Sequence, residues 1–191
     1  MKRERPMNYT NVIERIPAGK HGVAEVIHDT PDPFERLRGA LHGQPLNRET
    51  YVRLLVRNQI MMTDAEFERR TNAWPLLKAK GDALIAGLGL GLILDPLIER
   101  CKTVTVIEKE PDVIALVAHA FPNVKIIKGD ILRWQPRKKK FDFIYFDIWG
   151  EFSSDDLKIA NRLEGRYKPS LRRGGYMQSW VRIALEQFRG C

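Results

Sequence analysis

The sequence predicts an α/β protein: a Rossmann-like, mainly parallel sheet with helices on both faces, preceded by a small N-terminal β-hairpin region. Three observations predict this class. From residue 82 onward, short apolar segments alternate with helical ones, which is typical of right-handed parallel strand–helix–strand units. A glycine-rich turn follows the first of these strands, and three of the strands end in an acidic residue. The carboxyl ends of parallel strands are where α/β sheets bind ligands.

The chain has 191 residues, which suits one domain or one domain with a small appendage. A change of pattern, rather than of composition, divides it. We expect residues 1–65 to form an N-terminal strand and hairpin region. Residues 66–191 should form the Rossmann-like domain, which is short at its C-terminus because nothing strand-like follows the fifth expected strand. The exposed edge of such a sheet is an association hazard, so we also expect a homo-oligomer.

The N-terminal region predicts short strands and turns up to about residue 64. Gly22 to His28 alternates loosely between apolar and polar side chains, before Pro31 and Pro33 interrupt the pattern. Two apolar-rich runs, Tyr51 to Val56 and Gln59 to Thr63, flank a two-residue connection. They indicate a hairpin, although the turn lacks the favoured glycine.

A regular rhythm of strands and helices occupies the rest of the chain. It opens with a helix over Glu66 to Lys80, which Pro75 should disturb in the middle. The β-branched run Thr103 to Glu108 is typical of a strand, and Pro111 suits the first turn of a helix. The expected strands are Asp82–Ala86, Thr103–Glu108, Val124–Lys128, Phe141–Asp147 and Gly175–Trp180. The expected helices after residue 82 are Leu90–Cys101, Pro111–Ala120, Asp155–Tyr167 and Val181–Arg189.

The strongest functional feature is the run Ala86-Gly87-Leu88-Gly89-Leu90-Gly91 between a strand and a helix. Gly87 allows a tight turn, Gly89 allows the backbone to approach a ligand, and Gly91 allows close packing of helix against strand. The free N–H groups at the start of the helix suit a nucleotide pyrophosphate, or the carboxylate of an amino-acid-bearing nucleoside. The alternative is a glycine turn that serves packing alone.

Three acids end successive strands. Glu108 ends the strand after the glycine turn, where a carboxylate can accept hydrogen bonds from ribose hydroxyls. Asp130 follows the third strand and Asp147 ends the fourth. Any one of them can be a helix cap or a loop residue. Together they predict three carboxylates directed at one crevice.

Composition bounds the remaining possibilities. The formal charge is +8, with much of the excess at the N-terminal tip and in the run Arg137 to Lys140. That run is either a solvated loop or a phosphate-contacting patch, so nucleic acid is a candidate partner. The two cysteines, Cys101 and Cys191, and the scattered histidines give no metal spacing, and a reducing cytoplasm is the expected compartment. No apolar run is long enough for a membrane helix and no secretory signal is evident, so no membrane partner is expected.

Residues 82–180 resemble the class I S-adenosylmethionine (SAM)-dependent methyltransferase fold, and within it the spermidine synthase-like, or aminopropyltransferase-like, branch. The resemblance rests on the glycine loop and on three later segments, Val106–Ile114, Gly129-Asp130 and Phe141–Asp147. Met62 to Phe67 is also similar to the segment that precedes the glycine loop in aminopropyltransferases.

The resemblance implies a role for each matching residue. The loop glycines would hold the methionine portion of the cofactor, and Glu108 would bind the ribose hydroxyls. Asp130 would accept from the adenine amino group, with Ile131 against the ring. Asp147 would lie near the sulfonium as the catalytic residue, orienting an amine or taking its proton. The implied cofactor-binding set is Gly87, Leu88, Gly89, Gly91, Glu108, Lys109, Asp130, Ile131 and Asp147.

Two aromatic residues beside the catalytic position are candidate substrate contacts. Trp149 either stacks on a substrate or packs as an ordinary wall residue, and Tyr145 lies two residues before Asp147. The sequence does not identify the acceptor itself, which is either a small molecule or a larger partner.

The departures from the branch bear on the reaction. Leu90 stands where spermidine synthases carry an acid, and Ile148 to Glu151 lacks their second aspartate. A cationic polyamine would also meet Arg69 and Arg70 unless these point away. We therefore expect a SAM-dependent methyltransferase acting on an unidentified acceptor. The alternatives are aminopropyl transfer from decarboxylated SAM, and a SAM-binding, SAM-degrading or nucleic-acid-binding protein that transfers nothing.

Overall fold

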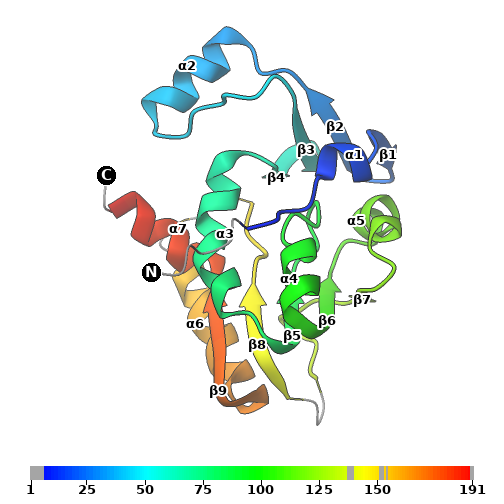
Figure 1. Ribbon diagram of the computed structural model, residues 1–191, viewed down its shortest axis with the longest axis vertical. Helices are drawn as coiled ribbons and strands as arrows, with labels where there is room; N and C mark the ends of the chain where they lie inside the picture. Colours follow the sequence, from blue (N-terminus) through cyan, green and yellow to red (C-terminus); the bar gives the residue numbers. More distant parts are fainter. Residues whose placement is uncertain (1–6, 137–139, 151–152, 154, 190–191) are drawn as a thin grey trace.

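The computed structural model describes residues 7–136, 140–150, 153 and 155–189 (Figure 1). It contains two sheets. A four-stranded antiparallel sheet has the order β1-β2-β3-β4, and a five-stranded sheet has the order β7-β6-β5-β8-β9 with every neighbouring pair parallel. The predicted fold class is therefore confirmed.

The antiparallel sheet consists of β1 (Gly19–His21), β2 (Ala24–Asp29), β3 (Tyr51–Val56) and β4 (Gln59–Thr63). The predicted hairpin is β3 and β4, with the predicted bounds. Its turn residues Arg57 and Asn58 have φ values of 51° and 66°. This left-handed conformation at both central positions is what a two-residue hairpin turn needs, and asparagine tolerates it better than most residues.

Two helices interrupt the N-terminal region, where we predicted only strands and turns. They are α1 (Val12–Arg15) and α2 (Pro33–Leu41). The prolines were interpreted as a break, but Pro33 occupies the first turn of α2. The amide of Glu35 donates to Asp32 Oδ1 (2.8 Å) and the amide of Asp32 donates to Glu35 Oε2 (3.2 Å). This reciprocal capping box starts the helix.

The alternation of strands and helices after residue 82 is confirmed. The helix that precedes it, α3 (Glu66–Lys78), runs through Pro75. The strands are β5 (Gly81–Ala86), β6 (Cys101–Glu108), β7 (Lys125–Lys128), β8 (Phe141–Phe146) and β9 (Leu171–Ser179). The helices are α4 (Leu94–Arg100), α5 (Pro111–Val117), α6 (Asp156–Tyr167) and α7 (Trp180–Arg189), with 3₁₀ turns at Ala118–Ala120 and Lys168–Ser170.

The start of the helix after the glycine loop differs from the predicted start by a full helical turn. We expected the helix after the glycine loop to begin at Leu90, but α4 begins at Leu94. Gly89 and Gly91 have φ values of 50° and 68°, which an α-helix cannot include. The loop is therefore longer, and the helix shorter, than the sequence pattern indicated.

Both faces of the parallel sheet are covered. Along β5, Ala83 and Ile85 join one buried cluster and Leu84 joins another, as expected for a strand with alternating faces. Leu97 of α4 belongs to the first cluster and Leu163 of α6 to the second. Helices therefore lie on both faces, as predicted.

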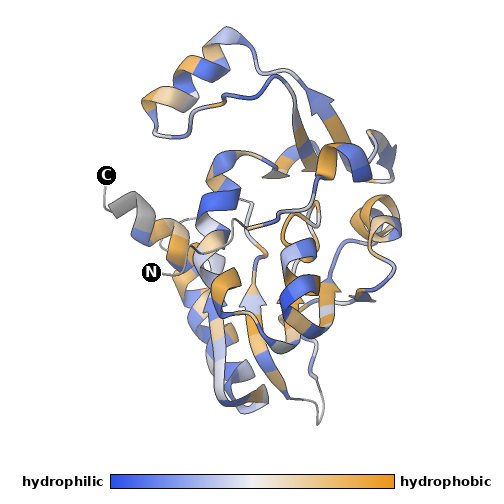
Figure 2. Cartoon of the chain, in the orientation of Figure 1, coloured by the Kyte–Doolittle hydropathy of each residue, from blue (hydrophilic) through white to orange (hydrophobic). Residues whose placement is uncertain are grey.

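The antiparallel sheet shares the first of these cores. Val12 of α1 and Leu54 of β3 belong to the same buried cluster as Ala83. By contrast, α2 projects from the top of the molecule in Figures 1 and 2, and none of its residues is buried. The N-terminal region is thus anchored through α1 and its strands.

Several residues named from the sequence lie outside the described residues: Lys2, Arg3, Arg5, Arg137–Lys139, Glu151 and Cys191. In the part that is described, no helix is both long and apolar enough to cross a bilayer. Within the same ranges, no group of three or more His, Cys, Asp or Glu side chains is placed to hold a metal ion.

Candidate functional site

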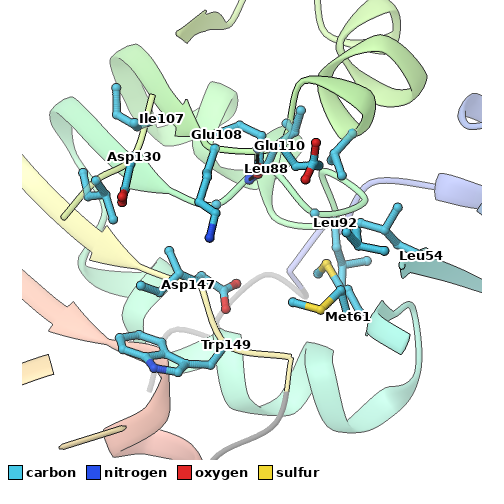
Figure 3. Close-up of a pocket in the computed structure, with 18 of the residues that line it drawn as sticks. Leu54, Met61, Leu88, Leu92, Ile107, Glu108, Glu110, Asp130, Asp147 and Trp149 are labelled. Carbon is cyan, nitrogen blue, oxygen red and sulfur yellow. Dashed lines mark hydrogen bonds between the residues drawn. The ribbon is translucent and has the colours of Figure 1, made fainter. Parts of the chain in front are cut away.

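A cavity of about 290 Å³ lies at the carboxyl ends of the central parallel strands (Figure 3). The central strand β5 pairs with β6 on one side and with β8 on the other, so the strand order reverses here. Crevices at this reversal are the usual ligand sites of open α/β sheets. Its volume is near the lower end of the range for small-molecule pockets, roughly 300 Å³, so a ligand would fill it.

The glycine loop forms one wall of the cavity. Gly87 has φ 97°, and a Cβ there would collide with the carbonyl oxygen of Asp147. A Cβ on Gly89 would collide with the sulfur of Met62, which itself accepts a hydrogen bond from the Leu90 amide (3.3 Å). Both glycines therefore allow close approach of other protein segments. That Gly89 also lets the backbone approach a ligand stays a prediction.

Gly91 does not line the cavity. A Cβ at this position would strike the ring of Phe121, so Gly91 allows the loop to pack against the segment after α5. The sequence predicted the packing role for Gly91. The resemblance also placed it in the cofactor set, and the geometry does not bring it to the cavity.

Glu108 faces the glycine loop. Its Oε2 accepts from the amide of Leu88 (2.7 Å), and its Oε1 accepts from the amide of Glu110 (2.8 Å). Each carboxylate oxygen has two acceptor sites, so both oxygens keep capacity for a further donor. The strand-end acid and the loop therefore form one unit, with lone pairs free for ribose-type hydroxyls.

Asp130 lies along the same wall, beyond β7. Its Oδ1 accepts from the amide of Leu132 (2.9 Å), which fixes the carboxylate in a turn. Ile131 follows it into the cavity lining, and Arg133 is only distantly paired with Asp130 at 3.9 Å. Lys109 and Trp149 line the cavity as well. Asp130, Asp147 and Trp149 are seen around the same space in Figure 3.

Asp147 and Glu68 form an acidic pair at this site. Burial raises the pKa of Asp147 to about 7. Burial, and then the charge of Asp147, raise the pKa of Glu68 to about 8, against a hydrogen bond from the Thr63 backbone that lowers it. The sequence analysis did not select Glu68. The signal that could have indicated it was the resemblance of Met62 to Phe67 to aminopropyltransferases, because Glu68 follows that segment directly.

Tyr145 is not on the cavity surface. It is fully buried, and no hydrogen-bond partner of its hydroxyl is found among the described residues. Burial, then the charges of Asp147 and Glu68, hold its pKa well above the usual value. The structure does not bring Tyr145 to the cavity, because its side chain packs in the buried cluster that contains Ile85 and Phe143. Direct contact between Tyr145 and a substrate stays an untested prediction.

The two arginines next to Glu68 point away from it. Arg69 Nε donates to the carbonyl of Asp64 (3.3 Å), and its guanidinium lies over the ring of Tyr9. The Arg70 guanidinium lies over the ring of Phe67. Arg69 and Arg70 therefore do not oppose the entry of a cation into the crevice, which was the condition set by the sequence analysis.

The wall opposite the sheet comes from the β3–β4 hairpin, which the sequence analysis did not associate with the site. Met61 and Met62 supply flexible thioether side chains there, and Leu54 and Val56 add apolar surface. Carboxylates on one wall and an apolar, sulfur-rich surface on the other suit a ligand that has both polar and apolar parts. No pattern along the chain predicts that a distant hairpin closes this crevice.

The parallel order and the strand-end carboxylates at one cavity are features that nucleotide-binding α/β proteins share. The family model for "Ribosomal RNA adenine dimethylase" matches residues 76–163. The match covers slightly less than half of the chain, and over these residues the protein is similar to that family, within the Rossmann-like fold already described. The match does not support the spermidine synthase-like branch suggested by the sequence motifs, because these motifs are short and lie in the part common to the superfamily.

Curated relatives agree with the family model. "Ribosomal RNA small subunit methyltransferase A" of Chlorobium chlorochromatii is 32% identical over 74 residues, covering 39% of this chain and 28% of that protein. The protein of the same name in Leptothrix cholodnii is 41% identical over 54 residues, covering 28% and 20%. The chain therefore spans less than a third of the length of these relatives.

Among solved structures, the N-methyltransferase NodS from Bradyrhizobium japonicum in complex with S-adenosyl-L-homocysteine (SAH) is 21% identical, with a TM-score of 0.47. The alignment covers 60% of this chain and 61% of NodS. A methyltransferase of Pseudomonas syringae aligns over 63% of this chain and 85% of its own, with 18% identity and a TM-score of 0.46.

Proposed function

We propose that this chain binds SAM in the crevice and transfers its methyl group to a nitrogen acceptor. We further propose that the acceptor is the amino group of an adenine in RNA, which is the acceptor class that the matching family and the relatives' names favour. One observation carries the cofactor proposal. The carboxylate of Glu108 is bound to the amide of Leu88, so that the ribose acid and the glycine loop form one binding surface.

Each wall residue has a task in this proposal. Glu108 accepts from the ribose hydroxyls, and Asp130 accepts from the adenine amino group with Ile131 against the ring face. Among the described residues, the amide of Leu90 donates to the thioether of Met62, a weak acceptor on a flexible side chain. A carboxylate would replace that sulfur with a stronger hydrogen bond, which suits the amino-acid tail of SAM.

The chemistry demands little of the protein beyond positioning. A methyl carbon on a sulfonium is already electrophilic, so the enzyme must hold a nitrogen in line with it and exclude water. In this proposal Asp147 orients the acceptor and receives its proton. The acidic pair also favours a cation in the crevice electrostatically, which includes the sulfonium.

The cofactor proposal predicts a loss of SAM affinity in Glu108→Ala. Hydrogen bonds to a charged group contribute roughly 1.5–3 kcal/mol, so affinity should fall by about 10- to 100-fold. Isothermal calorimetry measures the change, with Glu14→Ala, an exposed acid of α1, as the matched control. Equal SAM affinity in the Glu108 variant and the wild type would remove Glu108 from the site and the proposal with it.

The acceptor is tested separately. The wild type is incubated with methyl-labelled SAM and a small-subunit ribosomal RNA transcript, and the RNA is digested to nucleosides. Label in methylated adenosine supports the RNA proposal. SAM binding without label in adenosine would leave the cofactor site standing and contradict the acceptor.

A further inference from the structure

A second, larger cavity of about 590 Å³ adjoins the crevice. It lies between α2 with the loop that follows it, the β3–β4 hairpin and the first turn of α3. Trp180 of α7 forms one wall. Its volume lies within the range of small-molecule sites, roughly 300–1,000 Å³. None of the residues predicted from the sequence to form the site lines it.

The two cavities meet at the acidic pair. Glu68 lines both of them. In the loop after β8, Asp147 and Trp149 line the first cavity and Gly150 lines the second. A Cβ on Gly150 would lie 3.0 Å from Met61 Cα, so this loop packs tightly on β4. Glu68 and the loop are therefore the shared boundary between the crevice and the second cavity.

We propose that the second cavity receives the acceptor, and that the acceptor's amino group reaches the cofactor between Glu68 and Asp147. The inference rests on the proposed function, because it assigns the crevice to SAM. The ligand chemistry is a primary amine, carried either by a nucleobase or by an aliphatic chain.

The surroundings of the pair require a donor. Among the described residues, neither Glu68 nor Asp147 has a cationic partner, and Arg69 and Arg70 are engaged elsewhere. The fully buried hydroxyl of Tyr145 beneath them also has no partner in that part of the chain. Two ionised carboxylates in one cavity are unfavourable unless they take up a proton or are joined by N–H donors or a positive charge. An amine supplies both.

Charged and titratable side chains of several elements surround Glu68 and Asp147. Glu68 is faced by Tyr145 of β8, by Asp147 in the loop after β8 and by the Thr63 backbone of β4. Arg53, on the second cavity, is paired with Asp29 and Glu35. The other charged or titratable residues of the two cavities are Arg57, Glu108, Lys109, Glu110, Asp130, Arg38, His42 and Tyr51.

The pair can also take up the proton that the reaction releases. The amine nitrogen bonds to the methyl carbon, the carbon–sulfur bond breaks, and the sulfur keeps the electron pair. The nitrogen is then cationic, and its proton passes to whichever carboxylate of the pair is ionised. With pKa values near 7 and 8, the two groups are partly ionised just above neutral pH, so one of them can accept the proton.

The test uses protein saturated with SAH and two amine probes, a short oligoadenylate and 1,4-diaminobutane. Oligouridylate, which has no amino group, is the control probe. We expect one amine probe to bind the wild type, and to bind Glu68→Gln at least 10-fold more weakly at unchanged SAH affinity. Binding of the oligoadenylate identifies a nucleobase amine, and binding of diaminobutane an aliphatic one.

Two further variants separate the cavity from the carboxylate. Ile60 is half exposed on the rim of the second cavity, so Ile60→Trp should obstruct it without disturbing the core. Glu66→Gln, two residues before Glu68 and outside both cavities, is the matched control and should bind probes normally. Failure of both amine probes to bind the wild type, or binding to Ile60→Trp and Glu68→Gln as tight as to the wild type, would overturn the inference. Failure of SAH itself to bind would instead overturn the proposed function.

Discussion

At the scale of single residues, the acidic pair makes the stability of this protein depend on pH. The fold holds the pKa of Asp147 near 7 and that of Glu68 near 8, whereas the reference values are 3.8 and 4.5. Between about pH 4 and pH 8, the folded chain therefore binds more protons than the unfolded chain. Stability is full below the unfolded pKa values and falls as the pH rises through this window.

Asp147→Asn should flatten this dependence. The asparagine amide has no charge to bury. The difference in free energy of unfolding between the variant and the wild type should therefore be roughly 1–2 kcal/mol more favourable to the variant at pH 8 than at pH 5. Urea unfolding at the two pH values measures this change. Asp155→Asn, at an exposed acid paired with Lys158, is the control and should parallel the wild type. An Asp147→Asn curve that also parallels the wild type would show that Asp147 titrates normally.

At the scale of elements, α2 is held by its ends and its loop rather than by a core. The capping box of Asp32 and Glu35 starts it, and Arg36 donates to the carbonyls of Pro31 (3.2 Å) and Leu46 (2.5 Å). None of its residues is buried. Its unfolding should therefore be a local event with a lower free energy than global unfolding.

Asp32→Ala should loosen α2 alone. Loss of an N-cap costs about 1 kcal/mol, so amide exchange across Pro33–Leu41 should accelerate roughly fivefold. The global unfolding midpoint should stay unchanged. Hydrogen exchange with mass spectrometry measures both effects, with Glu49→Ala as an exposed control. A lower global midpoint in Asp32→Ala would mean that α2 belongs to the cooperative core.

The elements also show how much the sequence could predict. The strand and helix order is local information, and the strand-end acids follow from it because parallel strands end at the same edge. Glu68 and Met62 could not be found this way, because their place depends on how the antiparallel sheet packs over the parallel one. The start of α4 was missed because the φ values of the loop glycines are not evident from a hydrophobic pattern.

At the scale of the molecule, the N-terminal segment braces the glycine loop. The hydroxyl of Thr10 donates to the carbonyl of Gly91 (2.8 Å) and accepts from the amide of Asp95 (3.2 Å). Arg15 pairs with the carboxylate of Asp95 (2.6 Å). These contacts and the shared buried cluster join the two sheets. The division of the chain near residue 65 and the expected homo-oligomer remain predictions. The shared core leads to a further prediction, that the two regions unfold together.

Thr10→Val tests this coupling. Thr10 is fully buried, and valine would leave the Gly91 carbonyl and the Asp95 amide without their hydroxyl partner. Loss of this partner costs roughly 1–3 kcal/mol of the free energy of unfolding. Because Thr10 lies at the junction, both sheets should be destabilised together. Far-ultraviolet circular dichroism and tryptophan fluorescence should give one coincident transition, shifted to lower temperature, and SAM should bind more weakly through the loosened loop. Thr30→Val, at an exposed threonine, should change neither quantity. Two separated transitions in the wild type, or a shift confined to one probe in Thr10→Val, would mean that the sheets are independent and that the hairpin cannot hold the crevice closed.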